Sequence, residues 1–160
     1  MYAVKYFAKR SEDMIRKVTE ADRHSYIEMV KSFYNSEAVC HEIPISHIEA
    51  AFNEMMRSDV YMEGFMLELN RETAGYANIA KTFSCEGGGL TVWIEELFIL
   101  PQFRCKGLGR ELFAFLEQHY GSSLARMRLE VTDENERAAK LYRALGFEPL
   151  EYRQLVKEFR

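Results

Sequence analysis

Two hydrophobic periodicities alternate along the chain. Strand-like runs bounded by turn residues occupy residues 14–18, 61–69, 73–83, 90–100, 126–131 and 152–159. Helical stripes, with apolar residues three or four positions apart, follow residues 22, 46, 107 and 135. The predicted order β-α-α-β-β-β-α-β-α-β describes a mixed α/β sheet with helices packed on it. Residues 1–13 precede the first element and are interpreted as a leader strand or an arm.

Several helix ends carry recognisable signals. Three predicted starts have side chains suited to accept hydrogen bonds from the unpaired amides of a first helical turn. They are Thr19-x-x-Asp22, Ser46-x-x-Glu49 and Asp133 followed by Glu136. Gly146 is expected to end the last helix in a left-handed conformation. The sequence Asn70-Arg71-Glu72 predicts a short turn between two strands.

Composition and charge narrow the class of protein. The 160 residues fit one domain, and 48% hydrophobic with 29% charged residues is an ordinary globular balance. The apolar runs fall well short of the ~20 residues that a bilayer requires, so we expect no membrane span. The net charge is 21 − 25 = −4, which argues against nucleic acid as a partner.

The cysteines indicate a reducing compartment. There are three, Cys40, Cys85 and Cys105, with no C-x-x-C pair. An odd number without that spacing predicts neither a disulfide framework nor a metal site. Residues 1–10 also lack the apolar core of a secretory signal. We therefore expect a cytoplasmic protein without a metal.

The strongest candidate for chemistry is the loop Arg104-Cys105-Lys106-Gly107-Leu108-Gly109, followed by Arg110. It lies between an apolar strand and an amphipathic helix. Its two glycines allow close approach of a ligand to the backbone, and a helix N-terminus attracts anions. Such a site suits a pyrophosphate, although an ordinary strand-to-helix turn with solvated basic residues would look similar. The spacing is that of neither a P-loop nor a dinucleotide fingerprint.

Two segments carry a family resemblance. The stretch Glu95–Gly109 resembles the acyl-CoA-binding motif of the GCN5-related N-acetyltransferases (GNAT), a strand followed by [QR]-x-x-G-x-[GA]. The stretch Leu129–Phe147, which contains Asn135, Leu141 and Tyr142, resembles the second motif of that family. Two motifs in the right order are more specific than either alone. The resemblance implies a mixed, mostly antiparallel sheet with helices on both faces, and acetyl-CoA as cofactor.

The resemblance also assigns residues to coenzyme A. Backbone amides near Phe98 and Ile99 would bind the pantetheine arm, the loop would hold the pyrophosphate, and Asn135 would either bond the arm or simply begin a helix. The implied cofactor-binding set is Leu97, Phe98, Ile99, Arg104, Cys105, Lys106, Gly107, Leu108, Gly109, Arg110, Asn135, Ala138 and Tyr142.

Adjacent carboxylates interrupt the most apolar strand, residues 90–100. Glu95 and Glu96 are costly there unless they are paired or face a wet cleft. Strand alternation lets only one of them face a cleft, unless a bulge intervenes. One functional interpretation is a base that removes a proton from an ammonium substrate, whose pKa is about 10.4. Either glutamate could be this base, and Glu96 is the preferred candidate. The structural alternative is that one or both form ion pairs with nearby arginines.

Tyr142 lies on the apolar stripe of the last predicted helix, which on its own suits a core residue. The resemblance instead implies a proton donor near the sulfur of coenzyme A. The expected effect is modest, about 10²-fold, because a thiol of pKa near 8.5 is already a tolerable leaving group.

The expected activity is transfer of the acetyl group to a primary amine of a small molecule by direct attack. Tyr34, His41 and Glu63 are candidate substrate-binding residues, and Glu42 and Asp59 would add negative charge that attracts a cation. Two alternatives stay open: acetylation of a protein lysine or N-terminus, and a non-catalytic module that binds coenzyme A. The resemblance also allows a homodimer.

Overall fold

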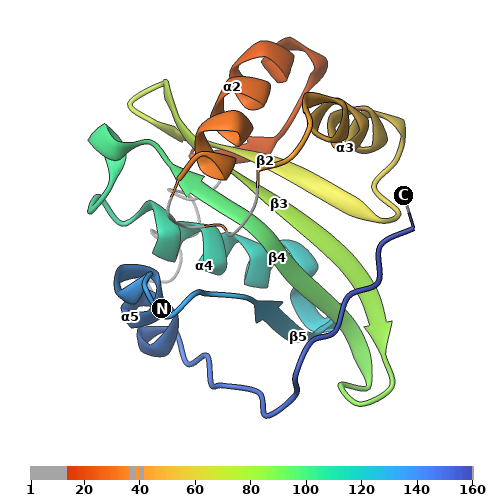
Figure 1. The fold of residues 1–160 in the computed structure, drawn as a ribbon. Helices are drawn as coiled ribbons and strands as arrows, with labels where there is room; N and C mark the ends of the chain where they lie inside the picture. Colours follow the sequence, from red (N-terminus) through yellow and green to blue (C-terminus); the bar gives the residue numbers. More distant parts are fainter. Residues whose placement is uncertain (1–13, 37–38, 40–41, 160) are drawn as a thin grey trace.

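A five-stranded sheet organises the computed structural model, which describes residues 14–36, 39 and 42–159 (Figure 1). The strands are β1 (Ile15–Lys17), β2 (Met62–Leu69), β3 (Glu72–Ser84), β4 (Gly89–Ile99) and β5 (Leu124–Leu129). They lie in sequence order; β1 to β4 pair antiparallel, whereas β5 pairs parallel with β4. This confirms the predicted mixed, mostly antiparallel sheet. In the described part of the chain, no helix is both long enough and apolar enough to span a bilayer.

Helices cover both faces of the sheet (Figure 1). They are α2 (Arg23–Tyr34), α3 (Ile45–Arg57), α4 (Leu108–Tyr120) and α5 (Glu136–Ala144). On the face of α2 and α3, the buried core includes Tyr26, Phe52 and Tyr76. On the face of α4 and α5, it includes Phe65 and Phe113. Each such side chain contributes about 1.5–3 kcal/mol by leaving water, so both helix pairs are fixed to the sheet.

An extra residue in β4 changes which side chains face each core. The register with β3 pairs Asn78 with Glu96 but Ile79 with Ile94, so Glu95 is left over as a β-bulge. Strict alternation would put Ile94 and Phe98 on one face. Because of the bulge, Ile94 joins the core under α4, whereas Phe98 joins the core under α2.

The parallel pairing of β4 and β5 is short. It runs from Leu90 opposite Leu124 to Ile94 opposite Leu129, where β5 ends. Strand β4 continues to Ile99 while still paired with β3. From Glu95 to Ile99, about 13 Å at the usual rise of a strand, the side of β4 that faces β5 has no ladder partner in the described chain. A gap therefore opens between the two strands.

Helix caps differ from the sequence prediction at two of three starts. At the first, the hydroxyl and the amide of Thr19 both donate to Asp22 at 2.8 Å, which confirms that capping box. The prediction at Ser46 is wrong: the N-cap is extended Pro44, two residues earlier, so Ser46 already lies inside the first turn of α3. The prediction at Asp133 is also wrong, since the side chain of Asn135 accepts from the amide of Ala138.

The backbone conformation expected after the last helix and in the β2–β3 turn is confirmed. Gly146 follows α5 with φ of 87°, the left-handed value favourable to glycine. Asn70 and Arg71 both adopt positive φ between β2 and β3, as a tight hairpin turn requires.

The predicted last strand is absent. Residues 152–159 form neither helix nor strand and are exposed. A strand needs a neighbouring strand to pair with its amides and carbonyls, and this segment pairs with no strand in the described chain. Its apolar residues therefore predict a strand that does not form in the single chain.

Candidate functional site

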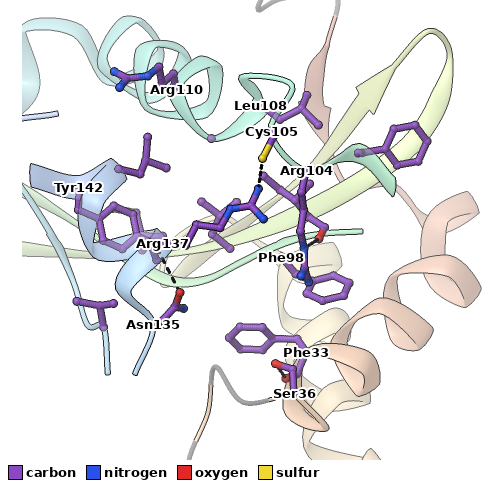
Figure 2. A pocket seen from close by; sticks show the side chains of 18 of the residues that line it. Phe33, Ser36, Phe98, Arg104, Cys105, Leu108, Arg110, Asn135, Arg137 and Tyr142 are labelled. Atoms are coloured by element: carbon purple, nitrogen blue, oxygen red, sulfur yellow. Dashed lines mark hydrogen bonds between the residues drawn. The ribbon is translucent and has the colours of Figure 1, made fainter. Parts of the chain in front are cut away.

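A pocket of about 910 Å³ opens where β4 and β5 separate. Its walls come from β4, from the residues after β5, from the N-terminus of α4, from α5 and from the end of α2 (Figure 2). In this view Phe33 and Phe98 lie at one end, and Arg110 lies at the other. One cavity thus joins the predicted anion loop to the bulged part of β4.

The loop before α4 has the backbone expected of an anion site. Gly107 caps the helix with φ of 88°, and a Cβ placed on it would meet nothing within 4 Å. Cys105 also has positive φ, 60°, so the loop turns sharply twice. Because α4 is 13 residues long, its free N-terminal amides and dipole favour negative charge. The open backbone at Gly107 lets a phosphate approach these amides.

Gly109 serves close packing rather than ligand approach. A Cβ at this position would lie 2.8 Å from Cδ2 of Leu141. The missing side chain lets α4 lie directly against α5, and this brings the first turn of α5 to the loop.

Two arginine side chains lie at the loop: Arg104 belongs to the loop itself, and Arg137 comes from α5. Nε of Arg104 donates to the carbonyl of Ile99 at 2.9 Å. Arg137 crosses from α5 to the loop, with a guanidinium nitrogen 3.2 Å from Sγ of Cys105 (Figure 2). The sequence interpretation did not single out Arg137. Its position one residue before Ala138, at the start of a helix whose motif was recognised, was the available signal.

Most of the predicted cofactor residues do come together. Those lining the pocket are Leu97, Phe98, Ile99, Arg104, Cys105, Gly107, Leu108, Gly109, Arg110, Asn135, Ala138 and Tyr142. Lys106 is not among the lining residues; its ammonium lies 5.2 Å from the centre of the Phe103 ring. The side chain of Asn135 is used as the cap of α5, which is the structural alternative considered for it.

Glu95 and Glu130 line the pocket together. Ile94 and Leu129 form the last pair of the β4–β5 ladder, and Glu95 and Glu130 are the residues that directly follow them. They therefore face the opening from opposite sides. Partial burial raises the pKa of Glu95, and the nearby carboxylates of Glu130 and then Glu96 raise it further. Glu130 belongs to the second motif, but the sequence alone did not mark it as a site residue.

Glu96 lies instead in a hydrogen-bonded network under α2. Its Oε2 accepts from Tyr76 at 2.7 Å and from Asn78 at 3.0 Å, and its Oε1 accepts from Tyr34 at 3.0 Å. Burial raises the pKa of Glu96, and these three donors oppose that rise. Since its oxygens already have partners and it does not line the pocket, Glu96 is poorly placed to accept a substrate proton.

Tyr142 projects from α5 into the wall of the pocket (Figure 2). Its ring packs against Phe113 and Phe147, with centroids 5.8 Å and 5.9 Å away. Burial raises the pKa of its hydroxyl, so the phenol keeps its proton at neutral pH. This hydroxyl forms no hydrogen bond with the described residues.

The candidate substrate residues do not gather at the pocket. Glu63 is buried on β2 between the ammonium groups of Lys81 and Lys17, at 2.8 Å and 2.7 Å. Burial alone would raise the pKa of Glu63, but the two lysines lower it to about 2. Its role is therefore structural, which corrects the expectation. Tyr34 bonds Glu96 rather than lining the pocket.

The remaining residues singled out in the sequence lie away from the pocket or outside the described residues. Asp59 forms an ion pair with Lys17 at 3.3 Å, beside the Glu63 cluster. Glu42 is exposed and is not among the lining residues. His41, Cys40 and the predicted arm at residues 1–13 lie outside the described residues.

Comparisons with known proteins agree with this fold. The sequence model of the Acetyltransferase (GNAT) family matches residues 26–147. The thialysine N-epsilon-acetyltransferase of Mus musculus is 25% identical over 153 residues, covering 85% of this chain and 84% of that protein. A possible acetyltransferase from Clostridium difficile 630 has the same fold, with a TM-score of 0.76 at 17% identity, covering 91% of this chain and 97% of that chain.

The fold is also that of the aminoglycoside N-acetyltransferase AAC(6')-Iy. The structure of AAC(6')-Iy in complex with the bisubstrate analog CoA-S-monomethyl-acetylneamine superposes on this chain with a TM-score of 0.74. Its sequence is 21% identical, and the match covers 91% of this chain and 97% of that chain. The family match and the pocket together define the class of protein, an acyltransferase that uses an acyl-CoA. Because the family match spans most of the sequence, the chain belongs to the GNAT acetyltransferase family and is an N-acetyltransferase.

The left-handed glycine of the loop gives a test of the anion site. Replacing Gly107 with alanine should strain the loop by about 1–2 kcal/mol and shift the amides that face the phosphate. Because the displaced amides no longer face the phosphate, we expect the dissociation constant for coenzyme A to rise about 10-fold, which corresponds to about 1.4 kcal/mol. Isothermal titration calorimetry measures it directly.

Gly88 provides the matched control for this substitution. It also has positive φ, 69°, and open space at the Cβ position, but it lies in the turn before β4. Gly88→Ala should lower the melting temperature about as much as Gly107→Ala and leave coenzyme A affinity unchanged. Equal affinities for the two variants would exclude the loop backbone from ligand binding.

Proposed function

We propose that the enzyme transfers the acetyl group of acetyl-CoA to the primary amine of a small molecule by direct attack. The observation that carries this proposal is a single pocket that joins the anion loop, Glu95 and Tyr142. The names of the similar proteins support an amine acceptor, since they refer to thialysine and to an acetylneamine analog. Acetyl-CoA supplies an acetyl group that is activated as a thioester.

The residues of the loop and of β4 would hold the coenzyme at its two ends. Amides from Cys105 to Gly109, with the guanidinium groups of Arg104, Arg110 and Arg137, would hold the diphosphate. The unpaired side of β4 near Phe98 and Ile99 offers backbone groups to the pantetheine arm. An amide donor aimed at a thioester oxygen contributes about 3–4 kcal/mol to the transition state in a favourable case.

Glu95 is the better candidate for the base. It lines the pocket and forms neither a hydrogen bond nor an ion pair with the described residues, whereas Glu96 is occupied by three donors. Its raised pKa brings its proton affinity closer to that of an amine, which favours general base catalysis near neutral pH. Glu130 opposite would attract the ammonium form of the substrate.

Tyr142 would donate the proton that the departing thiolate needs. Its phenol stays protonated because burial raises its pKa, and no described residue competes for its hydrogen. Phe113 and Phe147 fix the ring orientation, so the hydroxyl is positioned before substrate binds.

Thiol release from acetyl-CoA across a panel of acceptors tests the activity. The panel should contain polyamines, aminoglycosides, amino acids with side-chain amines, and lysine or N-terminal peptides. We expect turnover with at least one small amine and negligible turnover with peptides. Faster turnover of a peptide would favour protein acetylation, and coenzyme binding without any release would favour a non-catalytic module.

Removal of the Tyr142 hydroxyl should slow the chemical step without weakening the binding of acetyl-CoA. In Tyr142→Phe we expect kcat to fall about 10²-fold, with little change in the affinity for acetyl-CoA by calorimetry. The control is Tyr120→Phe, which removes a hydroxyl bonded to Glu63 at 3.0 Å outside the pocket and should leave kcat unaltered. An undiminished kcat in Tyr142→Phe would remove this residue from the mechanism.

The two adjacent glutamates should differ in the pH dependence of kcat/KM. In the native enzyme, activity should fall with acid as Glu95 protonates, at a pH above its ordinary value of 4.5 because its pKa is raised. Glu95→Gln should lose this acid limb and lower kcat/KM about 10²- to 10⁴-fold at pH 7. Its activity should then rise toward the pKa of the amine, about 10.4.

Glu96→Gln is the matched control for the base. The amide preserves the shape: its oxygen can accept from Tyr76 and Asn78, and its NH2 group can donate to the hydroxyl oxygen of Tyr34. We therefore expect the acid limb to remain. If Glu96→Gln abolishes the limb and Glu95→Gln does not, the two roles are exchanged.

A further inference from the structure

Just outside the pocket, one arginine of the sheet has no anionic partner. The guanidinium of Arg128 on β5 lies over the indole ring of Trp93 on β4, with its Cζ 4.4 Å from the ring centroid. Both side chains are partly buried. Within the described chain, this guanidinium forms neither a hydrogen bond nor an ion pair. Stacking occupies only the flat face of a guanidinium, so its N–H groups stay available to a ligand.

The charged neighbours of Arg128 along the chain make the missing partner informative. Arg126, two residues earlier, has its Nη1 3.0 Å from Oε2 of Glu86, so its charge is satisfied by another side chain. Glu130, two residues later, lines the pocket and forms no ion pair with Arg128 in the described chain. The guanidinium of Arg128 and the carboxylate of Glu130 are thus each left for a group that the chain does not supply.

Arg128 and Trp93 share a face of the sheet with the two carboxylates of the pocket. Ile94 and Leu129 pack into the core under α4, so the residues on either side of them point to the opposite face. Those residues are Trp93 and Glu95 on β4, and Arg128 and Glu130 at the end of β5. Neither Trp93 nor Arg128 belongs to the core under α2 and α3. The open part of this face therefore continues the pocket.

The spacing along the two strands sets a length for a ligand. Each pocket carboxylate lies two residues beyond Trp93 or Arg128, a separation of about 7 Å at the usual rise of a strand. An extended chain covers this distance with about six bonds. A molecule with a carboxylate at one end and an amine at the other, such as lysine, can therefore reach from Arg128 to Glu95 and Glu130.

We propose that Arg128, held against Trp93, binds a carboxylate of the acceptor, and that the acceptor is an amino acid acetylated on its side-chain amine. This inference rests on the proposed function and narrows its acceptor from any small amine to one that also carries an acid. A guanidinium matches a carboxylate with two parallel N–H bonds. One guanidinium beside two carboxylates suits this single negative charge better than the double charge of a phosphate.

The bound acceptor would lie with its two charges reversed relative to the protein. Its carboxylate meets Arg128, and its side-chain ammonium lies between Glu95 and Glu130. Glu95 takes one proton from the ammonium, and the free nitrogen forms a bond to the acetyl carbon as the carbon–sulfur bond breaks. The departing thiolate then takes the proton of Tyr142. Arg128 is a specificity-determining residue in this scheme and does not touch the reacting atoms.

The native enzyme tests the carboxylate requirement by steady-state thiol release. Cadaverine is lysine without its carboxylate, and lysine methyl ester is lysine with that charge removed. We expect kcat/KM for lysine to exceed that for either compound by about 10- to 100-fold, as a hydrogen-bonded charge pair implies. Diaminopropionate keeps the carboxylate but is too short to reach both ends, so it should also be a poor acceptor.

Arg128→Gln should move the two acceptors in opposite directions. Without the guanidinium, KM for lysine should rise about 10- to 100-fold with little change in kcat. KM for cadaverine should fall, because a doubly charged cation no longer meets a positive side chain. A purely structural role for Arg128 would shift both acceptors in the same direction, and that result would overturn the proposal.

Arg126→Gln is the matched control. It removes the same charge from the same face of β5, but from a guanidinium that pairs with Glu86, so both KM values should stay as in the native enzyme. An equal rise of KM for lysine in both variants would reduce the effect to general charge and overturn the proposal. Acetylation of amines without preference for a carboxylate would overturn this inference alone, whereas no acetylation of any small amine would overturn the proposed function with it.

Discussion

The separation of β4 from β5 depends on one extra residue in β4. Glu95 has no partner in the register with β3, and the pairing with β5 stops at the residue before it. The bulge therefore accomplishes two things at one position. It turns Phe98 toward the α2 core, and it leaves the following backbone free on the side where β5 ends. Without that free backbone the anion loop would begin a helix beside a closed sheet.

The pocket is electrostatically divided, and the division follows from the chain direction of β4. Glu95 and Glu130 lie at the point of separation, whereas the arginines belong to the loop after Ile99 and to the start of α5. A diphosphate and an ammonium therefore favour different ends of one cavity. With a net charge of −4, the proposed binding of an anionic cofactor would depend on this local arrangement of amides and guanidinium groups, whereas the overall charge would favour a cationic acceptor.

Much of the fold was predictable because its signals are local. Strands β2, β3 and β4 begin and end within one or two residues of their hydrophobic runs. The loop at Gly107 is recognisable from its two glycines, which come just before an amphipathic helical stripe. Other features depend on residues distant in sequence. Arg137 reaches the loop only because α5 packs on α4 at Gly109. Adjacent glutamates are equivalent in a sequence, and only the register with β3 shows which one is the bulge.

The occupied state of Glu96 follows from the same bulge. Once Glu95 is left out of the register, Glu96 must enter the aromatic core under α2, where an unpaired carboxylate would be costly. Tyr34, Tyr76 and Asn78 offset that cost by donating three hydrogen bonds. One of these donors comes from the last residue of α2, next to Phe33 and Asn35, which line the pocket. The buried carboxylate thus links the end of α2 to the bulged strand, and this link fixes the position of one wall of the pocket relative to Glu95.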